Sequence, residues 1–263
     1  MEIGLSTACF YPMPTEQALR LAVSLGFRAI EVFFNAECEF DEGYLCEMRG
    51  ILKDGGARVV SVHPYTSVME GLLFCSAYER RTDEGLRLYE RYFRAAQRLG
   101  ARSFTFHGER AMRPIPEAEN TAGKDAVANL NRLCALAGSY GITVSHENVA
   151  WCRSASPTYL KSLREGVDSL GFTLDIKQAV RANVAIERYL DVMAGRLTNV
   201  HLSDCAPGRS CMLPLEGTLN YPELLSKLRA AGYDAALMIE VYASDYSCSA
   251  QLVRARAGMQ ALL

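Results

Sequence analysis

The chain has 263 residues, of which 49% are hydrophobic, and its 28 basic and 30 acidic residues leave a formal net charge of −2 at pH 7. This balance argues against a protein that binds nucleic acid through bulk charge, although a local basic groove stays open. No uninterrupted apolar run approaches the length that spans a membrane. The length is ordinary for a single α/β barrel domain.

The N-terminal segment and the cysteines favour a cytoplasmic protein. The first residues, MEIGLSTACFYPMP, contain neither a basic stretch nor a long apolar core, so they do not resemble a secretory signal. The nine cysteines are odd in number and scattered, and none forms a CxxC pair. This usage is typical of reduced cysteine in core or loop positions rather than of a disulfide framework or a zinc ribbon.

Short apolar runs alternate with longer amphipathic segments along the whole chain. Each run is rich in β-branched or aromatic residues, which is typical of parallel strands buried on both faces. We predict strands at residues 3–8, 29–33, 58–62, 103–106, 142–145, 172–174, 197–200 and 236–239.

Helix patterns lie between these runs. The first, 15–22, begins at Thr15 as a capping residue, and Gly26 is the expected residue beyond its end. The same joint of helix end, glycine and new strand recurs in SLGFRAIEV, RLGARSFTF, SYGITVSHE and AAGYDAALMIE. The Pro- and Glu-rich segment 110–123 predicts a long loop after the fourth strand.

Eight strands that alternate with helices predict an α/β fold, a (β/α)₈ TIM barrel whose single domain covers residues 1–263. No GxGxxG follows the first strand, so a dinucleotide-binding fold has no direct support. No linker or low-complexity tract marks a second domain.

The residues that end the strands carry the functional signal, because active sites of barrels lie at the carboxyl ends of the strands. Six consecutive strands end in a His or a carboxylate: His63, His107, Glu147, Asp175, His201 and Glu240. One such residue alone is more often a hydrogen-bonded structural residue or a helix cap. Several carboxylates aimed into one mouth, however, raise each other's pKa and are costly without a cation.

The pattern therefore predicts one divalent metal ion. Glu147, Asp175, His201 and Glu240 form an oxygen-rich ligand set with one imidazole, which suits Mn²⁺, Mg²⁺, Co²⁺ or Zn²⁺.

The sequence resembles the xylose-isomerase-like TIM barrel superfamily, the sugar phosphate isomerase/epimerase family, over nearly its whole length. The resemblance rests on VSHENV, FTLDIKQA, NVHLSDCAPGR, LPLEGTLNY and MIEVY, and the H-x-x-D…G-R…E-G-x-x-N-Y stretch is its most specific part. The four metal ligands of that family match Glu147, Asp175, His201 and Glu240 one by one.

The resemblance implies a mechanism. In the ketose-epimerase and hydroxypyruvate-isomerase branches, the first and last Glu ligands act as acid and base on opposite faces of the substrate, and the metal stabilises an enediolate. Carried over, Glu147 and Glu240 are the catalytic pair of an isomerase or epimerase acting on a small carbohydrate, phosphorylated or not. Whether the chain forms a homo-oligomer is left open.

Four further residues are expected to bind substrate. His63 and His107 qualify by their strand-end positions. The resemblance places a substrate-contacting Arg near Arg209. Gln178 stands where many relatives carry a His, and it keeps hydrogen bonding but not the charge or the basic ligand.

Three other functions known for this fold compete with this expectation. Abasic-site DNA endonucleases of this fold build a three-metal cluster that needs the His replaced by Gln178 and an Asp-x-His pair where this chain offers only Glu216, so too few ligands remain. A metal-dependent lyase of the inosose dehydratase type can use the same site. A non-catalytic sugar-binding barrel is a further alternative, although intact Glu147 and Glu240 argue against it.

Overall fold

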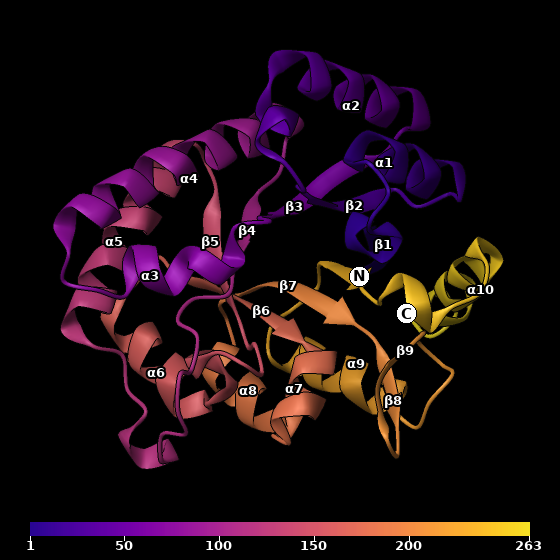
Figure 1. The fold of residues 1–263 in the computed structure, drawn as a ribbon. Helices are drawn as coiled ribbons and strands as arrows, with labels where there is room; N and C mark the ends of the chain where they lie inside the picture. Colours follow the sequence, from indigo (N-terminus) through magenta and orange to yellow (C-terminus); the bar gives the residue numbers. More distant parts are fainter.

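A computed structural model describes all residues of the chain, 1–263. Eight parallel strands close into one barrel in the order β1-β10-β7-β6-β5-β4-β3-β2, with helices around the outside (Figure 1), which confirms the predicted TIM barrel. The barrel strands are β1 (Glu2–Ser6), β2 (Ala29–Phe33), β3 (Arg58–His63), β4 (Ser103–Phe106), β5 (Thr143–Glu147), β6 (Gly171–Asp175), β7 (Leu197–Leu202) and β10 (Ala236–Ile239).

Nine α-helices lie in the connections between strands, and a tenth, α10, follows the last strand. They are α1 (Thr15–Ser24), α2 (Glu42–Gly55), α3 (Glu70–Phe74), α4 (Glu79–Leu99), α5 (Lys124–Ser139), α6 (Pro157–Gly166), α7 (Ile176–Ala182), α8 (Ile186–Met193), α9 (Tyr221–Ala230) and α10 (Ser249–Gln260). A short antiparallel hairpin, β8 (Asp204–Ala206) with β9 (Arg209–Met212), extends from the end of β7.

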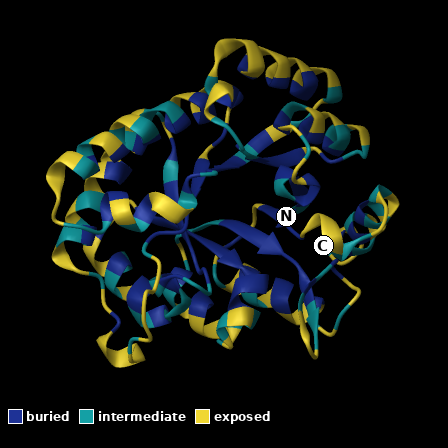
Figure 2. Ribbon diagram, in the orientation of Figure 1, coloured by how far each residue is buried: buried dark blue, intermediate teal, exposed yellow.

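The strands are short and apolar because both of their faces are covered. Every residue of β4, β6 and β10 is buried, with one face toward the barrel interior and the other under the helices. The helices are amphipathic in turn: α4 buries Tyr89, Tyr92 and Phe93, and its exposed residues face outward (Figure 2). This packing leaves the carboxyl ends of the strands to form one mouth.

Two local predictions need correction. The first strand ends at Ser6 rather than at residue 8, because residues Thr7–Phe10 turn into a 3₁₀ helix. Thr15 is not the cap of α1: Pro14 precedes the helix, and the Thr15 hydroxyl lies 2.9 Å from Glu39 Oε1 and 3.2 Å from Phe33 O. Gly26 follows the end of α1 with a φ of +86°, as expected for a residue in the left-handed region.

The remaining sequence expectations concern the loop after β4, the cysteines and the membrane. Residues 110–123 contain only the 3₁₀ turn Glu117–Glu119, so a long loop is confirmed. All nine cysteines are free thiols. None of the helices is both long enough and apolar enough to cross a bilayer.

Candidate metal centre

Four neighbouring strands bring the predicted ligands together. Glu147 and Asp175 are the last residues of β5 and β6, His201 lies near the end of β7, and Glu240 directly follows β10. His201 Nδ1 lies 3.0 Å from Glu240 Oε2, 3.5 Å from Asp175 Oδ2 and 3.8 Å from Glu147 Oε1. One ligand atom from each of the four residues lies within 4.8 Å of all the others.

These four residues fit a divalent cation. Glu147 Oε2, Asp175 Oδ2 and His201 Nδ1 are buried and have no hydrogen bond of suitable geometry. Buried polar atoms nearly always form hydrogen bonds, so three such atoms without one, gathered in one cluster, favour a partner that binds all of them. Carboxylate oxygens and a neutral imidazole nitrogen are the donors that Mn²⁺, Mg²⁺, Co²⁺ and Zn²⁺ use in proteins.

An asparagine holds the two neighbouring carboxylates in register. Asn148, directly after Glu147, accepts a hydrogen bond from Asp175 N at 2.7 Å and donates one to Asp175 O at 2.9 Å. The other oxygen of Asp175, Oδ1, accepts from Gln178 N at 2.8 Å and so caps α7. Asp175 is thereby locked with only Oδ2 turned toward the cluster.

Glu31 orients His201, and sequence reasoning missed it. His201 Nε2 lies 3.1 Å from Glu31 Oε2, and Asn199 Nδ2 donates to the same oxygen at 2.7 Å. Glu31 is fully buried in the middle of β2. Burial opposes its ionisation, but His201 outweighs burial and lowers the pKa of Glu31. A glutamate inside the apolar run AIEVF was the available signal.

His63 and His107 join the cluster from β3 and the residue after β4. His107 Nε2 lies 2.9 Å from His63 Nε2 and 3.0 Å from Glu147 Oε2, and the three residues form a second group that could hold a metal. Burial and the neighbouring His107 lower the pKa of His63 to about 4, so it is neutral at neutral pH. Burial opposes the charged form of His107, but Glu147 outweighs it and raises the pKa of His107.

Glu70 positions His107 through its backbone, and the sequence analysis did not identify this residue either. Its Oε2 accepts hydrogen bonds from the backbone N–H groups of His107 and Gly108 at 2.6 and 2.8 Å, and its Oε1 accepts from Tyr89 at 2.9 Å. Glu70 is fully buried at the start of α3. Burial raises the pKa of Glu70 to about 7. Its place in the chain, 37 residues before His107, offers no local signal.

Lys177 is the one lysine or arginine among the residues that line the site. Its ammonium lies 3.1 Å from Asp175 Oδ2 and 3.0 Å from Glu240 Oε2. Burial opposes its charge, but Asp175 and Glu240 outweigh burial and raise the pKa of Lys177 well above its usual value. The sequence analysis singled out Gln178 in DIKQ (residues 175–178) and assigned no role to Lys177.

Of the two remaining predicted substrate-binding residues, the fold brings Gln178 but not Arg209 to the cluster. Gln178 lines a pocket at the carboxyl ends of the strands, next to Glu147 and Glu240, and its Oε1 accepts a hydrogen bond from Ala150 N at 3.2 Å. Arg209 is exposed on β9 and is not among the residues that line this pocket. Its predicted substrate contact therefore remains a prediction that the geometry of this pocket does not support.

Asp204, the last residue of the HLSD motif, binds the backbone of the loop that follows β7. Its carboxylate accepts hydrogen bonds from four backbone N–H groups, those of Cys205, Leu215, Gly217 and Leu219, at 2.8–3.1 Å. Three of them belong to the PLEGTL segment, where Leu215 is held at a φ of +72°. The motif thus has a structural role: it ties the loop after β7 against the end of that strand.

Glu147 and Glu240, together with His63, His107 and Lys177, line the floor of a cavity of about 450 Å³ at the carboxyl ends of the strands. Aromatic side chains, among them Tyr11, Tyr65, Trp151 and Tyr242, form much of its wall. A cavity of this size accommodates a small molecule, and the rings offer flat apolar surfaces beside the polar floor.

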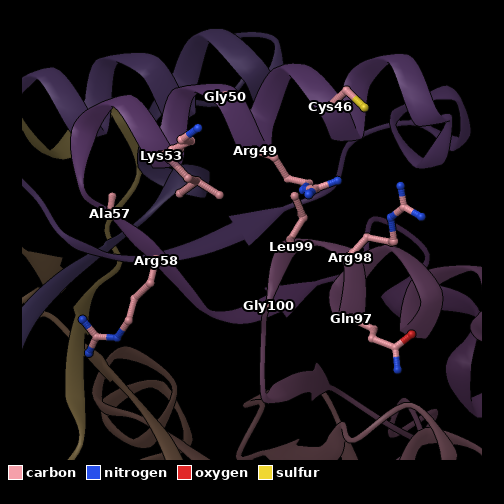
Figure 3. A pocket seen from close by; sticks show the side chains of 11 residues that line it. Cys46, Arg49, Gly50, Lys53, Ala57, Arg58, Gln97, Arg98, Leu99 and Gly100 are labelled. Carbon is pink, nitrogen blue, oxygen red and sulfur yellow. The ribbon is translucent and has the colours of Figure 1, made fainter.

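A second cavity, of about 590 Å³, lies between α2 and α4 near the starts of the strands, at the other end of the barrel (Figure 3). It is lined by Arg49, Lys53, Arg58 and Arg98, of which Arg58 pairs with Glu2 and Arg98 with Glu42 on the surface. No residue of the metal-ligand groups reaches it. We therefore place the candidate site at the mouth, not in this solvated groove.

A family model described as "Xylose isomerase-like TIM barrel" matches residues 19–262. The chain belongs to this family. This confirms the resemblance expected from the sequence. No curated protein matches the chain.

Solved structures share the fold at low sequence identity. A D-tagatose 3-epimerase-like protein aligns with a TM-score of 0.79 and 16% identity, over 100% of this chain and 97% of that one. The IolI protein with a bound zinc atom aligns with a TM-score of 0.77 and 16% identity, over 98% of this chain and 96% of that one. The probable 3-DHS dehydratase AsbF from Bacillus anthracis aligns with a TM-score of 0.74 and 17% identity, over 100% of this chain and 98% of that one. Identities this low show a shared fold.

Proposed function

We propose that this protein is a divalent-metal-dependent isomerase or epimerase acting on a small sugar or sugar phosphate. The observation that carries the proposal is that two glutamates, Glu147 and Glu240, belong to the same four-residue ligand set on the floor of a substrate-sized cavity. Structural likeness to a D-tagatose 3-epimerase-like protein and to the zinc-bound IolI protein supports it.

The two glutamates are placed to move a proton. Moving a hydrogen at a carbon next to a carbonyl needs a base that removes the proton and an acid that returns it. Glu147 and Glu240 come from β5 and from the end of β10, with β6 and β7 between them, so they approach the cavity floor from different sides. A divalent cation bound there supplies the electrophile that polarises the carbonyl and stabilises the negative charge that develops.

Their surroundings keep both glutamates in the ionised form. Burial opposes ionisation, but His107 and His201 outweigh it and hold the pKa of Glu147 well below its usual range. For Glu240, His201 and Lys177 have the same effect against burial. The ionised carboxylate is the form that can remove a proton from carbon, and the group that has taken the proton is the form that can return it.

The cavity wall suits a carbohydrate. The aromatic rings of Trp151 and Tyr65 can cover the C–H face of a sugar, while His63, Asn35 and Gln178 offer hydrogen-bonding groups for hydroxyls. Such a mixture of apolar surface and a few polar groups is usual in small-molecule sites.

A metal-dependent dehydratase is the second candidate. The likeness to the probable 3-DHS dehydratase favours it, because removal of the proton is shared and only the loss of a hydroxyl differs. Products distinguish the two: an isomer or epimer has the mass of its substrate, whereas a dehydratase product is lighter by one water.

The deciding experiment is the metal content of purified protein by elemental mass spectrometry, beside a Glu147→Ala/Asp175→Ala double variant. We expect about one metal per chain in the wild type and none in the variant. Loaded protein is then incubated with ketoses in D₂O, and incorporation of deuterium at carbon is followed by NMR. A protein that takes up no Mn²⁺, Mg²⁺, Co²⁺ or Zn²⁺ would refute the proposal.

A further inference from the structure

Lys177 occupies an unusual position for a charged residue. Its side chain is only 6% exposed, and its ammonium lies within 3.1 Å of two of the proposed metal ligands, Asp175 and Glu240. A buried lysine without a reason is costly, so its place against the ligand set requires an account.

The ammonium contacts the same oxygen atoms that the metal needs. Asp175 Oδ2 lies 3.1 Å from Lys177 Nζ and 3.5 Å from His201 Nδ1. Glu240 Oε2 lies 3.0 Å from both nitrogens. Asp175 cannot offer its other oxygen instead, because Oδ1 caps α7 through Gln178 N. One ammonium and one metal ion therefore share two carboxylate oxygens.

Electrostatic repulsion acts when the Lys177 ammonium and a divalent metal ion are both at the cluster. In the protein alone, Lys177 offsets part of the negative charge that Glu147, Asp175 and Glu240 concentrate in one buried cluster. A divalent ion bound by Asp175 Oδ2 and Glu240 Oε2 would lie close to the ammonium in a medium that screens poorly, and the two cations repel. The lysine is the partner that can move, since its flexible chain carries a single charge.

The cavity offers the ammonium a second position. Lys177 lines the cavity, and its Nζ already lies 5.2 Å from the centroid of the Tyr242 ring, within reach of a cation–π contact. Arg181 holds that ring by its hydroxyl at 2.7 Å. The ammonium can therefore turn from the carboxylates toward the cavity while it keeps contact with the ring.

We propose that Lys177 is a built-in counter-ion of the metal centre, which competes with the divalent cation for Asp175 and Glu240 and turns into the substrate cavity when the cation binds. This rests on the proposed function only in requiring that the cluster binds a metal. The loaded site then presents one ammonium to the cavity, where no other lysine or arginine is among the lining residues.

The first test compares Mn²⁺ dissociation constants, measured by calorimetry on metal-free protein, for the wild type, Lys177→Met and Lys177→Arg. Lys161→Met, an exposed lysine on α6, is the control. We expect Lys177→Met to bind Mn²⁺ at least tenfold more tightly than the wild type, and Lys177→Arg and the control to bind within about threefold of it. If Lys177→Met does not fold without metal, Lys177→Gln replaces it, and both are also compared as Mn²⁺-refolded proteins by chelator competition.

The second test follows the movement itself. Brief acetylation with acetic anhydride, read by mass spectrometry of peptides, compares the reactivity of Lys177 with and without Mn²⁺. We expect Mn²⁺ to raise acetylation of Lys177 at least threefold and to leave that of Lys161 unchanged. Equal or lower reactivity with Mn²⁺ would overturn the proposed movement.

The outcomes separate this inference from the proposed function. Equal Mn²⁺ affinity in wild type and Lys177→Met overturns the competition and leaves a metal-dependent enzyme intact. Binding by Lys177→Met but not by the wild type upholds the competition and refutes the metal-dependent enzyme. Binding by neither overturns both.

Discussion

His201 Nε2 lies 3.1 Å from Oε2 of Glu31, on the opposite side of the ring from the nitrogen that faces the three other ligands. A ligating histidine generally donates its second N–H to a carboxylate or carbonyl, which selects the tautomer and makes the free nitrogen a better ligand. Glu31 thus directs Nδ1 of His201 toward the other three proposed ligands from a strand three positions away in the order of the barrel.

Glu31→Gln should weaken metal binding without removing any ligand. The amide keeps the shape of the side chain but loses the charge that favours the Nε2–H tautomer, so we expect a ~10- to 100-fold rise in the metal dissociation constant. Calorimetric titration with Mn²⁺ measures it. Glu2→Gln, at the opposite end of the barrel, is the control, and equal affinity in the two variants would refute the orienting role of Glu31.

Glu147→Gln and Glu240→Gln should each abolish deuterium exchange at the substrate carbon. Each amide retains an oxygen that can face the metal but cannot accept a proton, and loss of a general acid or base costs ~10²- to 10⁴-fold in rate. NMR in D₂O measures exchange, and elemental analysis shows whether metal is still present. Substantial exchange in either metal-loaded variant would contradict the acid–base assignment.

Asp204→Ala should destabilise the protein, because four backbone N–H groups lose their acceptor at once. Buried donors left unpaired cost ~1–3 kcal/mol each, and local rearrangement recovers part of this, so we expect a loss on the order of 3 kcal/mol in the free energy of unfolding. Urea denaturation measures it.

A glycine beside Asp204 gives an independent check on this loop. A Cβ at Gly217 would overlap Cys205 O and Asp204 Oδ1, so Gly217→Ala should also be destabilising. A Cβ at Gly123 meets nothing within 4 Å, which makes Gly123→Ala the matched control. Equal stability of these two alanine variants would mean that the loop is not held as tightly as the hydrogen bonds to Asp204 indicate.

Glu70 should make stability depend on pH. Burial raises its pKa from 4.5 to about 7 in the folded protein, so the folded state keeps a proton that the unfolded state has lost. The stability linked to this proton is fully present below pH 4.5 and is lost as the pH rises to about 7. Glu70→Gln removes the titration, and its amide can still accept from the backbone of His107 and Gly108 and donate to Tyr89.

The prediction therefore concerns the difference in unfolding free energy between the wild type and Glu70→Gln. Between pH 4.5 and pH 8 the wild type should lose stability relative to Glu70→Gln, by up to ~3 kcal/mol, from about 1.4 kcal/mol for each unit of pKa shift. Urea denaturation at both pH values measures the difference. A constant difference would show that Glu70 does not titrate in this range.

Much of the architecture and of the ligand set could be predicted from the sequence. Strands buried on both faces require apolar runs, and a barrel gathers the residues that end them, so Glu147, Asp175, His201 and Glu240 stood out where hydrophobic runs stop. The same logic placed His63 and His107 beside them.

The residues that control the ligands could only be found from the tertiary structure. Glu31 and His201 are 170 residues apart, and Lys177 and Glu240 are 63 apart, yet each pair is in direct contact. A local pattern shows that a buried charge needs a partner but not which one, because the partner is chosen by the order of strands around the closed barrel. Residue type and position along the strands determined what could bind a metal here, while closure of the barrel decided which carboxylate orients His201 and which cation lies against Asp175 and Glu240.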